Sequence, residues 1–479
     1  MKKLLAMLLA LVMVLSLAAC GEKTKPTDAP KATDAPKATE APKATDAATE
    51  APTEAPKGDP VYINENAKEL TGKITFWTAF ADNLGTGALK EEFNKYYPNI
   101  EVETIVYKNN SDGNVALDLA IQQGEVDVCL SFAMKNTYER WANGLFVDIT
   151  DRLAADNLDL VTEWGSDTYV YEDRVYSFPS GALNFYIAIN EDKWNAAGLG
   201  EVPTEWTWDE YLDACRKLTE RDANGNVTCY GGLDFSDNDS WTWRVKQVKG
   251  QDQFYKEDGT SDFDNPLWAK ALQIEVDAVN EGIWLAKPVL KNEMQWRNRD
   301  AILSGTVATT VDSILTRYIR GYMDHDFKII YAPYPVMEKG QTNYCWGATP
   351  NSHIGIASTT DDLEASYAFA KFAATYGNKY MYASGHAGTW SGNNGDEILE
   401  VVFGSVEEAE KWVDPWGFNE YVVSAGKPAY ADTNITAISE IMAEVSDLTN
   451  YVLVGEMEVE DMMEELKDFA DEAIEDAQK

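Results

Sequence analysis

Short hydrophobic segments alternate with amphipathic ones along the chain that follows residue 60. Runs rich in β-branched and aromatic residues predict strands, and apolar positions three to four residues apart predict helices. The order is strand, helix, strand, helix, strand, at residues 73–77, 88–96, 100–107, 115–123 and 126–132. This order predicts a parallel sheet that is covered by helices on both faces.

The same patterns continue to the end of the chain. Further strands are predicted at 186–190, 327–332 and 353–356, and long helices at 361–376, 436–453 and 459–477. Asn224 and Gly225 predict a tight hairpin turn, because this pair readily adopts the positive φ angles that such turns require. A chain of 479 residues can bury a large core and is expected to form two or more domains.

The N-terminus has the pattern of a secretion signal. Two lysines precede an apolar stretch at 4–17 that is too short to span a bilayer comfortably. Leu17-Ala18-Ala19-Cys20-Gly21 resembles the lipobox of bacterial lipoproteins, in which the cysteine is lipidated. We therefore predict a signal peptide at 1–20 and a lipid on Cys20, which places the mature protein on the outer face of the cytoplasmic membrane.

Residues 21–60 are of low complexity. The unit Thr-Asp-Ala-Pro-Lys-Ala at 27–32 recurs at 33–38 and, with Glu in place of Asp, at 39–44. Such a segment has no apolar face to bury, so it is predicted to be a disordered tether. Its length suits a stalk that crosses the cell wall of a Gram-positive bacterium.

Charge and cysteine content exclude several classes of function. The chain holds 80 acidic and 40 basic residues, and its net charge of −40 argues against a nucleic-acid partner. With three His, five Cys and neither a CxxC nor an HExxH motif, neither a metal site nor another cofactor is predicted. Cys215 and Cys229 are compatible either with a disulfide or with two free buried thiols.

Several motifs resemble extracellular solute-binding proteins of the sugar type (family 1), which serve ABC transporters. Gly144-Leu145-Phe146-Val147-Asp148-Ile149-Thr150 is similar to the family's G-L-x-x-D-L-T turn. Ala197-Gly198-Leu199, followed by Pro203 to Glu210, is similar to its A-G-L and P-x-T-W-D-E motifs. Further similar segments stand in the family's order at 176–179, 185–190, 303–309, Gly347 with 354–356, and 365–374.

The resemblance implies an α/β, two-lobe, periplasmic-binding-protein-like (type II) fold with the ligand in a cleft between the lobes. Lobe 1 would comprise 70–179 plus 312–380, and lobe 2 would comprise 180–311 plus 381–479. It also implies a monomer that closes around a carbohydrate, most simply an oligosaccharide, and delivers it to an ABC permease. The chain has no Walker motif, so ATP hydrolysis would belong to another subunit.

A sugar site needs aromatic rings for the C–H faces and directed polar groups for the hydroxyls. In open α/β sheets such groups follow the carboxyl ends of strands. Trp390 is favoured because it stands in a polar, glycine-rich loop, and Trp241 is preferred to Trp243 on a presumed strand. The candidates are Trp77, Phe80, Asp82, Phe132, Tyr186, Trp241, Asp312, Trp346, Trp390 and Asn393. For each of them, packing in the core is the competing interpretation.

Two other functions are compatible with the sequence. A surface glycoside hydrolase would need two carboxylates at a defined separation, but no motif singles out one pair among 80 acidic residues. No catalytic residue is therefore predicted. A surface adhesion protein without a small ligand is the third interpretation.

Overall fold

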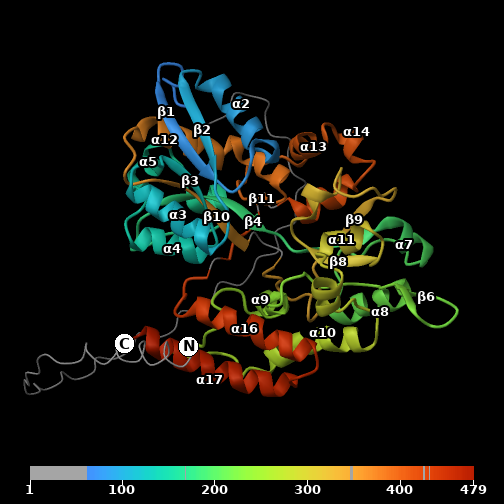
Figure 1. The fold of residues 1–479 in the computed structure, drawn as a ribbon. Helices are drawn as coiled ribbons and strands as arrows, with labels where there is room; N and C mark the ends of the chain where they lie inside the picture. The colour runs from blue at the N-terminus through green and yellow to red at the C-terminus, as the bar shows by residue number, and fades with distance from the viewer. Residues whose placement is uncertain (1–61, 168, 346–348, 424–426, 431) are drawn as a thin grey trace, which may run out of the picture. The chain divides into compact units, whose positions relative to one another are not determined.

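The computed structural model describes residues 62–167, 169–345, 349–423, 427–430 and 432–479 (Figure 1). The predicted signal peptide, Cys20, the predicted tether and Trp346 lie outside the described residues. No helix within the described ranges is both long and apolar enough to cross a membrane. Nor do those ranges contain a group of three or more His, Cys, Asp or Glu side chains that could hold a metal ion.

A six-stranded sheet with the strand order β11-β4-β10-β3-β1-β2 forms the first half of the fold, called lobe 1 here. β1, β2 and β3 are parallel, whereas β10 runs antiparallel to both β3 and β4. The strands are β1 (Gly72–Thr78), β2 (Ile100–Val106), β3 (Val128–Phe132), β4 (Ser177–Leu183), β10 (Thr349–Ile356) and β11 (Ala387–Gly388). The helices are α2 (Thr86–Tyr96), α3 (Ser111–Gln122), α4 (Met134–Ala142), α5 (Thr150–Ala155), α6 (Leu160–Trp164), α12 (Leu363–Ala374) and the 3₁₀ helices η1 (Asp82–Leu84) and η5 (Tyr376–Ser384).

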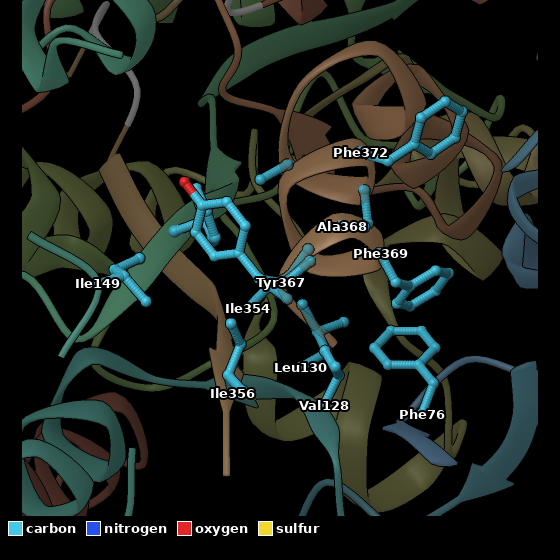
Figure 2. Packing of buried hydrophobic residues seen from close by; sticks show 14 of the residues in the cluster. Phe76, Val128, Leu130, Ile149, Ile354, Ile356, Tyr367, Ala368, Phe369 and Phe372 are labelled. Atoms are coloured by element: carbon cyan, nitrogen blue, oxygen red, sulfur yellow. The ribbon is translucent and has the colours of Figure 1, made fainter. Parts of the chain in front are cut away.

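Helix α12 covers one face of this sheet. All its residues from 365 to 374 are buried, and the one charged residue among them, Lys371, is paired with Asp156 at 2.8 Å. Figure 2 shows Phe369 of α12 against Phe76 of β1, with ring centroids 5.0 Å apart. Burying side chains of this size contributes about 1.5–3 kcal/mol each. A second apolar cluster, around Leu117 of α3 and Trp141 of α4, holds helices against the other face.

A three-stranded antiparallel sheet with the order β8-β5-β9 forms the centre of lobe 2. Its strands are β5 (Tyr186–Asn190), β8 (Thr309–Asp312) and β9 (Ile329–Pro333), and a separate hairpin pairs β6 (Glu220–Arg221) with β7 (Val227–Cys229). The helices are α7 (Glu191–Ala196), α8 (Trp208–Leu218), α9 (Trp243–Lys249), α10 (Pro266–Asn280), α11 (Asn298–Leu303), α13 (Gly395–Phe403), α14 (Val406–Ala409), α15 (Pro415–Gly417), α16 (Ile438–Leu453) and α17 (Val459–Ala477). Short 3₁₀ and π turns complete it at η2 (Ser240–Thr242), η3 (Val289–Glu293), η4 (Leu315–Tyr318) and η6 (Phe418–Val422).

The strand pairing changes two of the predicted lobe assignments. Residues 329–333 were predicted to lie in lobe 1, but β9 pairs with β5 in the sheet of lobe 2. Residues 387–388 were predicted to lie in lobe 2, but β11 pairs with β4 in the sheet of lobe 1. The chain therefore passes between the lobes at other positions than those predicted.

Three local predictions meet different outcomes. The hairpin turn at Asn224 and Gly225 is confirmed, since β6 pairs with β7 and Gly225 has a φ angle of 85°. The strand predicted around 241–243 is wrong, because these residues belong to η2 and the start of α9. Cys215 and Cys229 are free buried thiols, so the disulfide alternative is excluded in this structure.

Candidate functional site

The chain passes from lobe 1 to lobe 2 at two short crossing segments that concentrate polar and aromatic groups. One is 183–186, between β4 and β5, and the other is 389–394, between β11 and α13. The two lobes contact each other nearby: a Cβ placed on Gly385, before β11, would lie 2.7 Å from the carbonyl oxygen of Ile314 in lobe 2. Gly385 also has a φ angle of 90°. Both the positive φ angle and the lack of space for a Cβ atom favour glycine here.

On the lobe 1 side, four rings form a continuous aromatic wall, defined as Tyr138, Trp141, Tyr169 and His353. Tyr138 and Trp141 lie three residues apart on α4, so they share one face of the helix. Their ring centroids are 4.9 Å apart, and the His353 centroid lies 5.5 Å from Trp141 and 5.2 Å from Tyr169. The wall brings together residues from a helix, a loop and a strand.

Polar atoms of this wall keep unused hydrogen-bonding capacity. The Trp141 indole donates to Ser177 Oγ over 3.1 Å, and Ser177 Oγ lies 3.0 Å from His353 Nδ1. The hydroxyl of Tyr169 and Nε2 of His353 are buried and have no hydrogen-bond partner among the described residues. Burial lowers the pKa of His353 to about 3, so its imidazole is neutral near pH 7. Buried polar groups normally find a partner, and for these two fully buried side chains a buried water could supply it.

On the lobe 2 side, helix α9 presents Trp243 to the first crossing segment. The half-buried Trp243 ring lies 4.0 Å, centroid to centroid, from Phe185, which also contacts Phe235 and Tyr334. Gln247, one turn further along α9, has a buried Oε1 atom without a partner among the described residues. Lobe 2, like the aromatic wall of lobe 1, therefore places aromatic rings next to a polar atom that has no hydrogen-bond partner within the described ranges.

The described parts of the segment 427–434, which are 427–430 and 432–434, join the two sides. The hydroxyl of Tyr138 in lobe 1 donates to the carbonyl oxygen of Asp432 over 3.0 Å. The Asp432 carboxylate in turn accepts from Lys246 of α9 at 3.0 and 3.1 Å. Ala429 donates its backbone N–H to Gly165 in lobe 1 at 3.1 Å. The segment thus contacts both lobes beside the aromatic wall.

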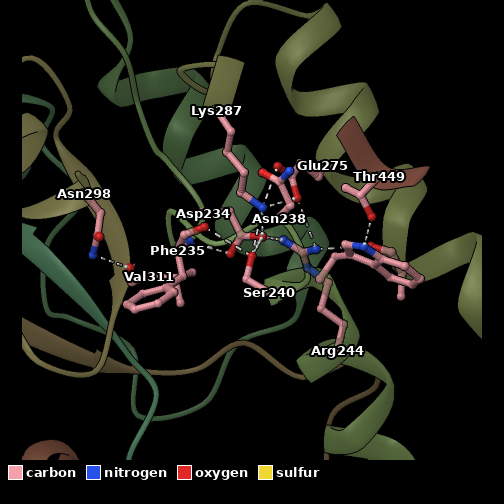
Figure 3. A network of polar contacts seen from close by, with 12 residues as sticks. Asp234, Phe235, Asn238, Ser240, Arg244, Glu275, Lys287, Asn298, Val311 and Thr449 are labelled. Carbon is pink, nitrogen blue, oxygen red and sulfur yellow. Dashed lines mark hydrogen bonds and ion pairs between the residues drawn. The ribbon is translucent and has the colours of Figure 1, made fainter. Parts of the chain in front are cut away.

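A buried charge network fixes helix α9 through Arg244 (Figure 3). Arg244 donates to Asp234 over 2.8 Å, and Lys287 donates to Glu275 over 3.0 Å and to Ser240 over 2.8 Å. The four charged side chains are each at most 1% exposed. Burial opposes ionisation of Asp234, but Arg244 and Lys287 hold its pKa below the usual range. Burial raises the pKa of Glu275, so Asp234 is the carboxylate that stays ionised beside the two cations, while Glu275 accepts from Lys287.

Six of the residues predicted from sequence come together in three pairs. Phe80 and Phe132 pack at 5.3 Å and both contact His386. Tyr186 and Asp312 face each other in the register of β5 and β8, fully buried. Burial raises the pKa of Asp312 to about 6, although backbone N–H groups of residues 313–315 favour its carboxylate.

Trp390 and Asn393 form the third pair. Both donate to Oδ1 of Asn378, at 3.1 and 2.9 Å. The Trp390 indole N–H is bound by the carboxylate of Glu163 at 2.8 Å, and a Cβ on Gly392 would lie 2.3 Å from its ring. Trp390 therefore has a packed ring and an occupied N–H in this structure.

The remaining described candidates lie apart from these pairs. Trp77 packs against the apolar cluster under α3 and donates to the carbonyl of Glu125 at 3.2 Å. Trp241 is fully buried and donates to Thr449 at 2.8 Å. Asp82 forms an ion pair with Lys90 at 2.9 Å. Each of these three residues makes its contact within its own lobe: Trp77 and Asp82 in lobe 1, and Trp241 in lobe 2.

Sequence reasoning missed Tyr138, Trp141, Tyr169 and His353, and it preferred Trp241 to Trp243. The spacing of Tyr138 and Trp141 was a usable signal, because aromatic residues three apart share a helix face. No local pattern indicated Tyr169 or His353, since their neighbours in the wall are distant in sequence.

Comparison with known proteins identifies the family. The sequence signature of bacterial extracellular solute-binding proteins matches residues 76–380. The chain belongs to this family. No curated protein sequence matches this solute-binding protein. Its family consists of binding proteins, in agreement with the prediction that the chain is not an enzyme.

Solved structures confirm the predicted two-lobe α/β fold. The ABC substrate-binding protein Lmo0181 of Listeria monocytogenes, solved with cycloalternan, has a TM-score of 0.65 and 18% identity, over 85% of this chain and 99% of its own. MalE of Xanthomonas citri has a TM-score of 0.63 and 15% identity, over 85% and 98%. GacH of Streptomyces glaucescens, solved with acarbose, has a TM-score of 0.59 and 17% identity, over 85% and 99%.

Proposed function

We propose that this solute-binding protein is the lipid-anchored extracellular receptor of an ABC uptake transporter. It binds a carbohydrate, in particular an oligosaccharide, between its two lobes and delivers it to the permease without changing it chemically. Cys20 carries the lipid, and residues 21–60 form the tether between the lipid and the lobes. The signal pattern at the N-terminus supports the anchor.

The observation that carries the proposal is the pairing of aromatic rings with unused polar atoms on both sides of the crossing. Sugars present apolar C–H faces to rings and hydroxyl groups to donors and acceptors. In lobe 1 the half-buried Tyr138 offers a ring, backed by the buried Trp141, Tyr169 and His353, and in lobe 2 the half-buried Trp243 offers a ring, backed by the buried Gln247. The solved relatives that carry cycloalternan and acarbose on the same fold support an oligosaccharide as the ligand.

Of the candidates predicted from sequence, Phe80 and Phe132 are retained as a second aromatic group beside the crossing. Tyr186 and Asp312 are paired in the ladder of β5 and β8, and we expect them to support the site from within lobe 2. Trp346 also remains a candidate.

Binding would act through closure of the lobes. A ligand stabilises the closed state only by the contacts that it gains there and lacks in the open state. The bonds from Tyr138 and Lys246 to Asp432 connect the two sides, so they would be among the contacts that change.

Titration with a sugar panel tests the proposal. Tryptophan fluorescence and calorimetry would follow glucose, maltose, maltotriose, cycloalternan and acarbose. We expect Trp243→Ala to weaken binding of the best ligand by about 1–3 kcal/mol, as for a stacked aromatic anchor. Trp416→Ala is the matched control, because Trp416 is 57% exposed on lobe 2 and should leave affinity unchanged.

The outcomes separate the competing functions. A wild-type protein that binds none of these sugars would contradict the carbohydrate receptor and favour an adhesion protein. Equal affinity of wild type and a folded Trp243→Ala variant would remove Trp243 from the site.

A further inference from the structure

A single buried carboxylate joins the start of the described chain to the second crossing segment. Glu163, at the end of α6, is 7% exposed. Its Oε1 atom accepts from the Tyr62 hydroxyl at 2.6 Å and its Oε2 atom accepts from the Trp390 indole at 2.8 Å. Its backbone carbonyl also accepts from the N–H of Ser391 at 2.8 Å. Both oxygens of one carboxylate are thus used to hold two distant parts of the chain.

Tyr62 stands two residues after the predicted tether. The residues that follow it are attached to lobe 1: Asn64 accepts from Lys371 over 2.7 Å and donates its N–H to the Tyr97 hydroxyl over 3.0 Å. Ala67 is buried in the lobe 1 core. Burial, with Glu163 beside it, raises the pKa of Tyr62, so its hydroxyl stays protonated and remains a donor. The tether junction is therefore a fixed part of lobe 1.

Trp390 stands in the segment that leads out of lobe 1. Before it, β11 pairs with β4, and after it Ile398 and Leu399 of α13 are buried in the core of lobe 2. The Trp390 ring meets Tyr62 edge to face at 6.4 Å. Relative rotation of the lobes must be absorbed in segments of this kind, because packed cores do not deform continuously.

We propose that Glu163 is a positioning residue that latches the tether junction to the crossing segment 389–394. Movement of this segment when the lobes open would pull Trp390 from Glu163, which would leave the buried carboxylate partly unsatisfied and weaken its hold on Tyr62. Each bond holds the Glu163 side chain in the position that the other bond needs, so loss of one bond lets the side chain move away from its second partner. The tether end and the hinge would therefore be coupled, and coupling of this kind is reciprocal.

Hydrogen exchange in the full mature chain tests the latch in both directions. Tyr62→Phe keeps the ring but removes the donor, and we expect amide exchange at residues 390–393 to become about tenfold faster, equivalent to about 1.4 kcal/mol. In the reverse direction, Trp390→Phe removes the indole donor, and exchange at residues 64–70 should rise by a similar factor. Glu163→Gln should raise exchange at both places.

A matched control is Tyr322→Phe in lobe 2, since the Tyr322 hydroxyl donates to Asp300 at the same 2.6 Å. It should leave both segments unchanged. The latch would be overturned if amide exchange at residues 390–393 is equal in the wild type and in folded Tyr62→Phe. It would also be overturned if Trp390→Phe changes exchange only at residues 389–394. The link between the latch and closure of the lobes around a sugar rests on the proposed function. However, the exchange readout needs no sugar, so absence of sugar binding would contradict the receptor without deciding the latch.

Discussion

At the scale of single residues, His353 shows how a titratable group can serve as a neutral polar group. It lies between the rings of Trp141 and Tyr169, and burial keeps its pKa at about 3. Ser177 lies at hydrogen-bond distance from Nδ1, while Nε2 has no partner within the described part of the chain. A neutral imidazole can donate or accept at that atom, and because His353 is fully buried, the partner that fits there is a buried water.

This burial predicts a specific dependence of stability on pH. The unfolded chain protonates His353 near pH 6.5, whereas the folded chain does so only near pH 3. Between these values the unfolded state binds more protons, so the free energy of unfolding falls as pH falls, by up to about 1.4 kcal/mol per pH unit for this residue. Urea unfolding at pH 7, 6 and 5 would measure it. His353→Gln should lose less stability on acidification than wild type, and equal losses would contradict the assignment.

Residue-level prediction from the sequence could not anticipate the surroundings of Trp390, and its role at the ligand stays a prediction. Its small polar neighbours suggested that it had no core to join and would face a ligand. In the structure the same small residues let its ring pack, because Gly392 leaves space beside it, and its N–H is held by Glu163. The partner comes from 227 residues earlier in the chain, so no local pattern could indicate it.

At the scale of elements, the sequence pattern was informative where hydrophobic periodicity is strong. The helix predicted at 459–477 and the strand predicted at 186–190 have these same bounds in the structure. The strand predicted around Trp241 and Trp243 failed because alternating tryptophans mimic a strand, whereas the segment forms η2 and α9. Arg244, bonded to Asp234, anchors this helix from within the core, and such a tertiary contact overrides local propensity.

The network around α9 predicts a large loss of stability when one charge is removed. Lys287→Met leaves Glu275 without its 3.0 Å donor in a fully buried site. We expect the free energy of unfolding to fall by about 3–5 kcal/mol, as is usual when a buried pair loses one partner. Denaturant titration would measure this loss.

The matched control for this change is Lys291→Met. Lys291 is half-buried and donates to Asn238 at 3.1 Å, outside the four buried charges. We expect a loss below about 1 kcal/mol, in the range of a partly exposed polar contact. A similar small loss for Lys287→Met would show that the network does not stabilise α9.

At the scale of the whole molecule, the fold class could be predicted but the passage of the chain between the lobes could not. The strand and helix order, with the family motifs, indicated two α/β lobes. The antiparallel pairing of β9 with β5 and of β11 with β4 joins segments that lie far apart in sequence. Such pairing is set by long-range register, which short hydrophobic segments do not encode by themselves. The same limit explains why the aromatic wall was missed.

The most direct test of the account is a distance measurement between the lobes with and without sugar. Cysteines introduced at the exposed residues Val115 in lobe 1 and Glu440 in lobe 2 would carry spin labels, in a chain with Cys20→Ser. The described native cysteines are buried and should not react. The account predicts that a sugar identified by titration shortens the distance between the labels at saturation. An unchanged distance with that sugar bound would contradict closure of the two lobes around the ligand.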